Sequence, residues 1–254
     1  MAACWGVVAV CALGQAVQPA RLAGIHPIAV SALLISLAMA ALAAAGVLLQ
    51  RSPARVVWGL EPGSLGVPRT CALAIGTIGV SQLLNTLLVE FGLGQQNAPS
   101  EIDRFLAQAA TPEYLLILAA FAIGPGIAEE VLFRGLILRS VASAYGSAIA
   151  LLSSSLLFGL AHPDLARAGA AALLGLWLGA IALRGGSIRA CIACHIANNV
   201  AAVAWLTLPV ARSGSGEPGD AAVALAASAG ATAIGFLALA TSHHPRHRDP
   251  AASR

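Results

Sequence analysis

Long apolar runs constrain this chain more than any other feature. A segment of about 20 apolar residues is long enough to cross a bilayer, and several runs here reach that length. Mean hydropathy is +0.83, with 58% hydrophobic and 10% charged residues. The pattern predicts an all-α, polytopic membrane protein with eight spans, at roughly 3–17, 27–49, 70–92, 113–138, 143–162, 168–184, 188–209 and 220–241.

The arginines predict how these spans are oriented. With the N-terminus in the cytoplasm, ten arginines fall on the inner side and four on the outer side, the bias typical of cytoplasmic loops. We therefore expect a multi-pass protein of the cell membrane with both termini inside and a basic polar tail at 242–254. The net charge of +3 follows from this asymmetry and does not indicate nucleic-acid binding. Residues 1–16 lack the basic start of a signal peptide, so we interpret 3–17 as a retained span.

We expect a single membrane domain over 1–254, because no linker or repeat divides the chain. The longest polar insert is 93–114. Ser100 and Asp103 resemble a capping box there, and the apolar residues after them fall on one helical face. This pattern predicts a short helix at the membrane interface, either a connector between two spans or a lid beside a substrate entrance.

Three ionisable residues in "GIAEEVLFRGLILR" (126–139) require an explanation, because charges inside a membrane are costly and normally pair or line a polar cavity. Neighbouring helical residues point about 100° apart, so Glu129 and Glu130 face different ways. Glu130 and Arg134, spaced i, i+4, are expected to pair. Glu129 then has no cation nearby in sequence. "GPG" at 124–126 is expected to loosen the helix beside it and to favour a water-filled cavity.

Two further polar pairs lie inside predicted spans. "FGLAH" places Phe158 and His162 on one helical face, and "HIANN" does the same for His195 and Asn199. A carboxylate, two imidazoles and an amide are sufficient for peptide hydrolysis, since one imidazole and the carboxylate deprotonate water while the other groups hold the oxyanion. The hydropathy pattern places His162 near the outer end of its span and His195 near the inner end of its span. Catalysis requires the two side chains to lie at the same depth in the membrane.

The motifs "EEVLFR", "FGLAH" and "HIANN", in this order, resemble EExxxR, FxxxH and HxxxN of the CAAX protease and bacteriocin-processing (CPBP, or Abi) family of intramembrane proteases. This family includes the Ras-converting CAAX endopeptidase. The resemblance covers a catalytic core at about 113–208. It implies that Glu129 and His162 activate water and that His195 and Asn199 stabilise the oxyanion. Glu130, Arg134 and Phe158 are implied as structural support.

The metal requirement stays open at this stage. The resemblance favours a metal-free glutamate mechanism without a cofactor, but Glu129, His162 and His195 are also a possible zinc set. "CIACH" (191–195) matches the attachment motif of c-type haem and contains a possible redox pair, Cys191 and Cys194. Neither haem attachment nor a redox pair accounts for Glu129, His162 and Asn199. We expect buried free thiols at these two positions and at the remaining cysteines, Cys4, Cys11 and Cys71.

The sequence therefore predicts an intramembrane endopeptidase that hydrolyses a peptide bond of a membrane-associated protein or peptide. Its expected partners are membrane lipid and that substrate. The alternative is a non-catalytic immunity or scaffold protein, or a transporter, although the single interrupted helix lacks the paired symmetry typical of transporters. Prenylation of the substrate and the oligomeric state are left open by the sequence.

Overall fold

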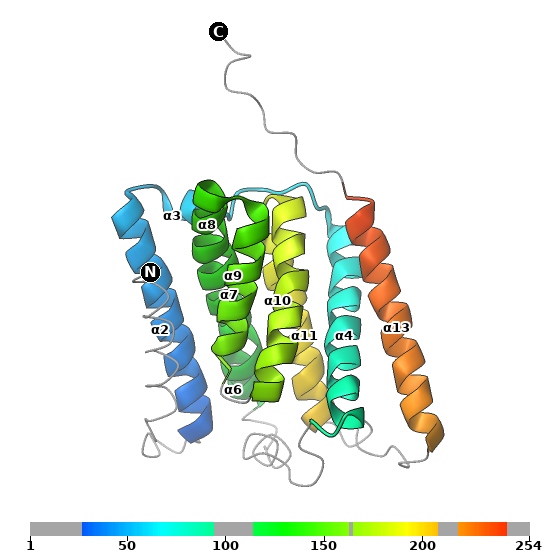
Figure 1. The fold of residues 1–254 in the computed structure, drawn as a ribbon. Helices are drawn as coiled ribbons and strands as arrows, with labels where there is room; N and C mark the ends of the chain where they lie inside the picture. Colours follow the sequence, from blue (N-terminus) through cyan, green and yellow to red (C-terminus); the bar gives the residue numbers. More distant parts are fainter. Residues whose placement is uncertain (1–26, 94–113, 163–164, 208–217, 243–254) are drawn as a thin grey trace.

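A computed structural model describes residues 27–93, 114–162, 165–207 and 218–242. In this part of the chain every regular element is a helix, which confirms the all-α class. The helices run side by side, with α2 at one edge of the bundle and α13 at the other (Figure 1). The elements are α2 (Pro27–Gln50), α3 (Ala54–Val57), α4 (Val67–Glu90), α6 (Tyr114–Leu118), η2 (Ala119–Ile123), α7 (Gly124–Glu129), η3 (Glu130–Ile137), α8 (Leu138–Tyr145), α9 (Ser147–Leu160), α10 (Leu165–Gly185), α11 (Arg189–Thr207) and α13 (Pro218–Ala240).

Five of the described helical segments are long and apolar enough to cross a membrane: Ile28–Gln50, Val67–Glu90, Tyr114–Tyr145, Arg167–Gly185 and Ala222–Ala240. They coincide with five of the predicted spans, so the protein is a multi-pass membrane protein. The span predicted at 143–162 is the shorter apolar helix Ser147–Leu160. The span predicted at 188–209 corresponds to α11 (Arg189–Thr207), which is not among these five segments. The first predicted span and most of the 93–114 insert lie outside the described residues.

The segment Tyr114–Tyr145 is helical throughout. The helix is therefore not interrupted at "GPG", where the sequence predicts that it is loosened. Gly124, Pro125 and Gly126 lie in the regular helix α7, whereas the π-helices η2 and η3 flank it. A proline ring clashes with the carbonyl one turn earlier, and here that preceding turn belongs to the π-helix η2 rather than to a regular α-helix. π-helical turns inside α-helices frequently occur at functional sites.

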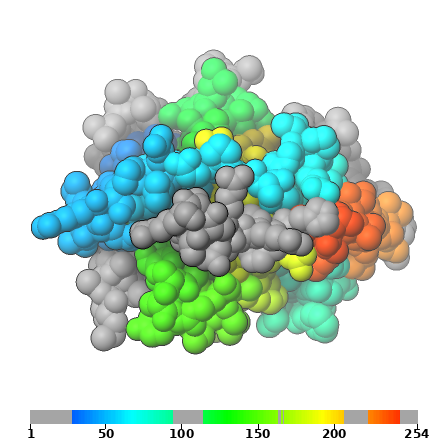
Figure 2. All heavy atoms as spheres, turned by 90° about the horizontal axis from the view of Figure 1, so that it is seen from above, coloured from blue at the N-terminus to red at the C-terminus, as the bar shows by residue number. Residues whose placement is uncertain are grey.

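The connection between α2 and α4, residues 51–66, runs across one end of the bundle (Figure 2). The Gly59 carbonyl accepts hydrogen bonds from Ile188 N (3.0 Å) and Ser187 Oγ (3.1 Å). Arg189 Nε donates to Leu60 O at 2.7 Å. Arg51 and Arg55 belong to this connection, and Arg69 lies in the first turn of α4. Arg184 O accepts from Ser64 Oγ at 3.4 Å, and the Arg139 side chain lies against Gly59. Six of the ten arginines that the sequence groups on one side of the membrane therefore lie at one end of the bundle. Arg134 is instead buried inside the bundle, and Arg246, Arg248 and Arg254 lie outside the described residues.

Close backbone contact joins α13 to α4. A Cβ atom added at Gly76 would lie 2.4 Å from Gly235 Cα, and one added at Gly235 would lie 2.7 Å from Gly76 Cα. Small residues allow membrane helices to approach this closely. α4 is also joined to α10, where Trp177 Nε1 donates to Thr77 Oγ1 at 2.9 Å.

The contact between α4 and α13 predicts opposite effects for two alanine substitutions on α13. Gly235→Ala should lower the melting temperature, because an overpacked contact typically costs about 1–3 kcal/mol. Gly230→Ala is the matched control. Nothing lies within 4 Å of the Cβ that it adds, and alanine is a better helix former by up to about 1 kcal/mol. Melting of both proteins in detergent tests this. Equal melting temperatures would show that the two helices are not in close contact.

Candidate active site

The two adjacent glutamates lie at the junction of α7 and η3 and differ in exposure. Glu129 ends α7 and Glu130 begins η3. The Glu129 side chain is 17% exposed, whereas that of Glu130 is fully buried. The two carboxylates therefore face different surroundings, as helical geometry predicts.

Glu130 pairs with Arg134, as the i, i+4 spacing predicts. Arg134 Nη1 lies 2.8 Å from Glu130 Oε1, and both side chains are fully buried. The guanidinium also donates from Nη2 to Gly175 O on α10 at 3.3 Å. Its carbon lies 4.3 Å from the centre of the Phe158 ring, a cation–π distance. Arg134 thus joins η3 to α9 and α10.

Glycine at position 175 permits this arrangement. A Cβ added there would lie 3.1 Å from Ser155 Cα and 3.3 Å from the Phe158 ring, which is tighter than an ordinary packing contact. α10 therefore approaches α9 closely enough for its Gly175 carbonyl to reach Arg134.

His195 lies between the two glutamates. Its Nδ1 is 2.8 Å from Glu130 Oε1, and its Nε2 is 3.7 Å from Glu129 Oε2. The ring is on α11 and is 4% exposed. Sequence reasoning placed His195 in the site but missed its contact with Glu130, because 65 residues separate them and only the packing of α11 against η3 brings them together.

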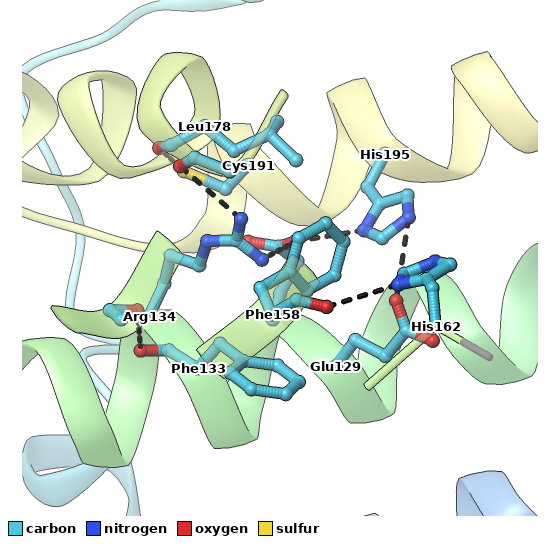
Figure 3. Close-up of polar contacts among 11 residues, drawn as sticks. Glu129, Phe133, Arg134, Phe158, His162, Leu178, Cys191 and His195 are labelled. Carbon is cyan, nitrogen blue, oxygen red and sulfur yellow. Dashed lines mark hydrogen bonds and ion pairs between the residues drawn. The ribbon is translucent and has the colours of Figure 1, made fainter. Parts of the chain in front are cut away.

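His162 reaches the same place from the end of α9. Its Nδ1 lies 3.0 Å from the Phe158 carbonyl oxygen. The Phe158 ring centre is 5.3 Å from that of His162 and 5.9 Å from that of His195. Figure 3 shows Phe158 between Arg134 and the two histidines. The two imidazoles therefore converge, although the hydropathy pattern placed them near opposite ends of their spans.

Asn199 is half-buried, one turn after His195 on α11. Its Oδ1 accepts a hydrogen bond from Asn198 Nδ2 at 3.4 Å. Within the described part of the chain, it is not hydrogen-bonded to Glu129, His162 or His195. Asn198 is the more buried of the two amides, and its contact with Asn199 was not foreseen from the sequence.

The surroundings of Cys191 and Cys194 test whether "CIACH" could attach a haem or form a redox pair. Cys191 and Cys194 are free and fully buried, and Cys191 Sγ donates to Leu178 O at 3.2 Å. Both thiols are enclosed by helix packing, where a haem group has no room, so the expectation of buried free thiols is confirmed for them. It is wrong for Cys71, which is free but exposed on α4. Cys4 and Cys11 lie outside the described residues.

The described residues also offer no ready metal site. In this part of the chain no group of three or more His, Cys, Asp or Glu side chains is arranged to hold a metal ion. His195 Nδ1 is bound to Glu130 and His162 Nδ1 to a carbonyl. Zinc would have to use the remaining ring nitrogens together with Glu129.

Membrane helices around a buried ion pair, a partly exposed carboxylate and two imidazoles define a polar intramembrane site. Residues 111–201 match the family model described as "Type II CAAX prenyl endopeptidase Rce1-like". This match confirms the resemblance to the CAAX protease family that the three motifs predict. No curated protein and no solved structure matches the chain. The matched family implies protease activity.

Proposed function

We propose that this protein is an intramembrane endopeptidase in which Glu129 and His162 activate a water molecule to cleave a membrane-associated protein or peptide. The observation that carries the proposal is the partly exposed Glu129 carboxylate. It lies 3.7 Å from a buried histidine, beside an ion pair that neutralises the second glutamate. Glu129 is thus the glutamate that keeps a carboxylate accessible to water.

The hydrogen bond of His162 supports its role as a base. A backbone carbonyl only accepts, so Nδ1 at 3.0 Å from Phe158 O carries the hydrogen. In the neutral ring, Nε2 then holds the lone pair. An imidazole fixed in this tautomer is ready to accept a proton from water.

The proposed reaction begins when water gives a proton to the Glu129 and His162 pair while its oxygen bonds to the carbonyl carbon. The π electrons of the C=O bond move to oxygen. His195 and Asn199 then stabilise this oxyanion by donating hydrogen bonds. Because Asn199 Oδ1 already accepts from Asn198, its Nδ2 remains to donate. Collapse of the intermediate breaks the C–N bond, and the stored proton passes to the leaving nitrogen.

A proteomic comparison of membranes tests this function even when the substrate is unidentified. Membranes that contain the wild-type protein should yield new peptide termini that are absent with Glu129→Ala at equal abundance. Identical terminal peptides under several growth conditions would favour the non-catalytic or transport alternatives.

The mechanism predicts that chelation leaves activity intact. If Glu129 and His162 alone activate water, strong chelators should not change the rate at which the purified protein cleaves peptides. Activity that is lost on chelation and restored by zinc would contradict this and would make His195 a ligand candidate.

We also propose that the arginine-rich end of the bundle faces the cytoplasm of the cell, which follows from the distribution of arginines in the loops. A reporter that is active only in the cytoplasm should then give a signal when it is fused after residue 254. A signal only from a reporter that is active after export, fused at the same place, would show that the orientation is the reverse.

A further inference from the structure

One oxygen of Glu130 contacts two nitrogen groups. Its Oε1 lies 2.8 Å from Arg134 Nη1 and 2.8 Å from His195 Nδ1. All three side chains are at most 5% exposed. An ion pair that served only to hold the helices together would need the first of these contacts. The second connects the pair directly to the imidazole that faces Glu129.

The contact with Glu130 decides which nitrogen of His195 carries a hydrogen. An ionised carboxylate only accepts hydrogen bonds, so Nδ1 of His195 must donate. Nε2 then faces Glu129 Oε2 at 3.7 Å. In the neutral ring Nε2 holds a lone pair, which cannot donate to an oxyanion. Nε2 becomes a donor only when the ring is protonated on both nitrogens.

Both ring nitrogens face carboxylate oxygens, Nδ1 at 2.8 Å from Glu130 Oε1 and Nε2 at 3.7 Å from Glu129 Oε2, and an ionised carboxylate only accepts. Glu129 and Glu130 contribute two negative charges and Arg134 one positive charge. Among the described residues, His162 packs against the same Phe158 ring as His195, and the thiols Cys191 and Cys194 lie within one turn before His195 on α11. With these three neutral, the cluster has a net charge of −1. Because an uncompensated charge is costly inside a membrane, a positive charge on His195, between both carboxylates, makes the cluster neutral.

We propose that Glu130 is a positioning residue, which holds His195 through Nδ1–H as an imidazolium so that its Nε2–H points to the reaction centre. Its catalytic consequence rests on the proposed function. Glu130 then acts in two ways that are separable by experiment: it neutralises Arg134, which stabilises the fold, and it orients and charges His195, which serves the chemistry.

The test uses the full-length protein with Glu130→Gln and Arg134→Met together, which removes the ion pair and leaves no unpaired charge from it. Nitrogen NMR of 15N-histidine-labelled protein in detergent at neutral pH reads the protonation of His195, which is assigned by its loss in His195→Gln. The wild type should show both ring nitrogens protonated. The double variant should show a neutral ring or mixed tautomers. Gly235→Ala, a destabilised protein altered at the contact between α4 and α13, should keep the wild-type signal.

Cleavage of a peptide mixture by the same proteins gives the second measurement. We expect the double variant to lose about a hundredfold or more in kcat, the loss typical when one oxyanion donor is removed, with a smaller change in KM. A His195 signal that shows a lone pair on Nε2 in the wild type, or the same protonation in the double variant, would overturn the proposal. If the NMR signals are as expected but the wild type cleaves nothing, the positioning stands and the proposed function fails.

Discussion

Replacing Glu129 with glutamine is expected to abolish proteolysis and leave the protein folded. The substitution keeps the size of the side chain and removes the carboxylate that takes the proton from water. Glu129 is partly exposed, and its Oε2 lies 3.7 Å from His195 Nε2, longer than a hydrogen bond. The loss of its charge therefore leaves the fully buried pair of Glu130 and Arg134 intact. We expect activity to fall by at least about a hundredfold, as is typical for loss of general-base catalysis, with wild-type abundance and melting temperature.

The matched measurements are peptide cleavage and melting in the same detergent preparation. A Glu129→Gln protein that cleaves at the wild-type rate would remove Glu129 from the mechanism. One that is inactive only because it fails to accumulate would give it a structural role instead.

Replacing Glu130 with glutamine is expected to destabilise the protein strongly. Its carboxylate is fully buried against Arg134, and the substitution leaves that guanidinium without a counter-charge. Breaking one side of a buried ion pair typically costs about 3–5 kcal/mol. The variant should therefore accumulate poorly or melt well below the wild type.

A second substitution should recover part of this loss. In Glu130→Gln with Arg134→Met, no unpaired charge from the pair remains, and apolar replacement of buried ion pairs is often neutral or stabilising. Melting of the single and double variants beside the wild type tests the assignment. If Glu130→Gln melts normally and is inactive, while Glu129→Gln is the unstable protein, the roles of the two glutamates are reversed.

Local spacing predicted much of the site. Glu130 and Arg134 form the expected i, i+4 pair, and Phe158 and His162 are in contact one turn apart. Such predictions need only the geometry of one helix. The five long spans were predictable for a similar reason, since the length of an apolar run follows directly from the thickness of the bilayer.

Features that depend on packing between helices were not predictable. His195 binds Glu130 only because α11 packs against η3, and Arg134 reaches Gly175 only because α10 lies close to α9. The π-helices on both sides of α7 also leave no mark in hydropathy. Exposure of Cys71 was missed because apolar residues that face lipid and those that face protein are alike in sequence.

The central claim is that Glu129 is the catalytic group of a membrane endopeptidase. Its most direct test is to reconstitute the purified wild-type and Glu129→Gln proteins in lipid vesicles with a defined peptide mixture and to detect new peptide termini by mass spectrometry. We predict internal cleavage products with the wild type and none with Glu129→Gln at equal folded protein. The same cleavage products from both proteins would contradict the claim.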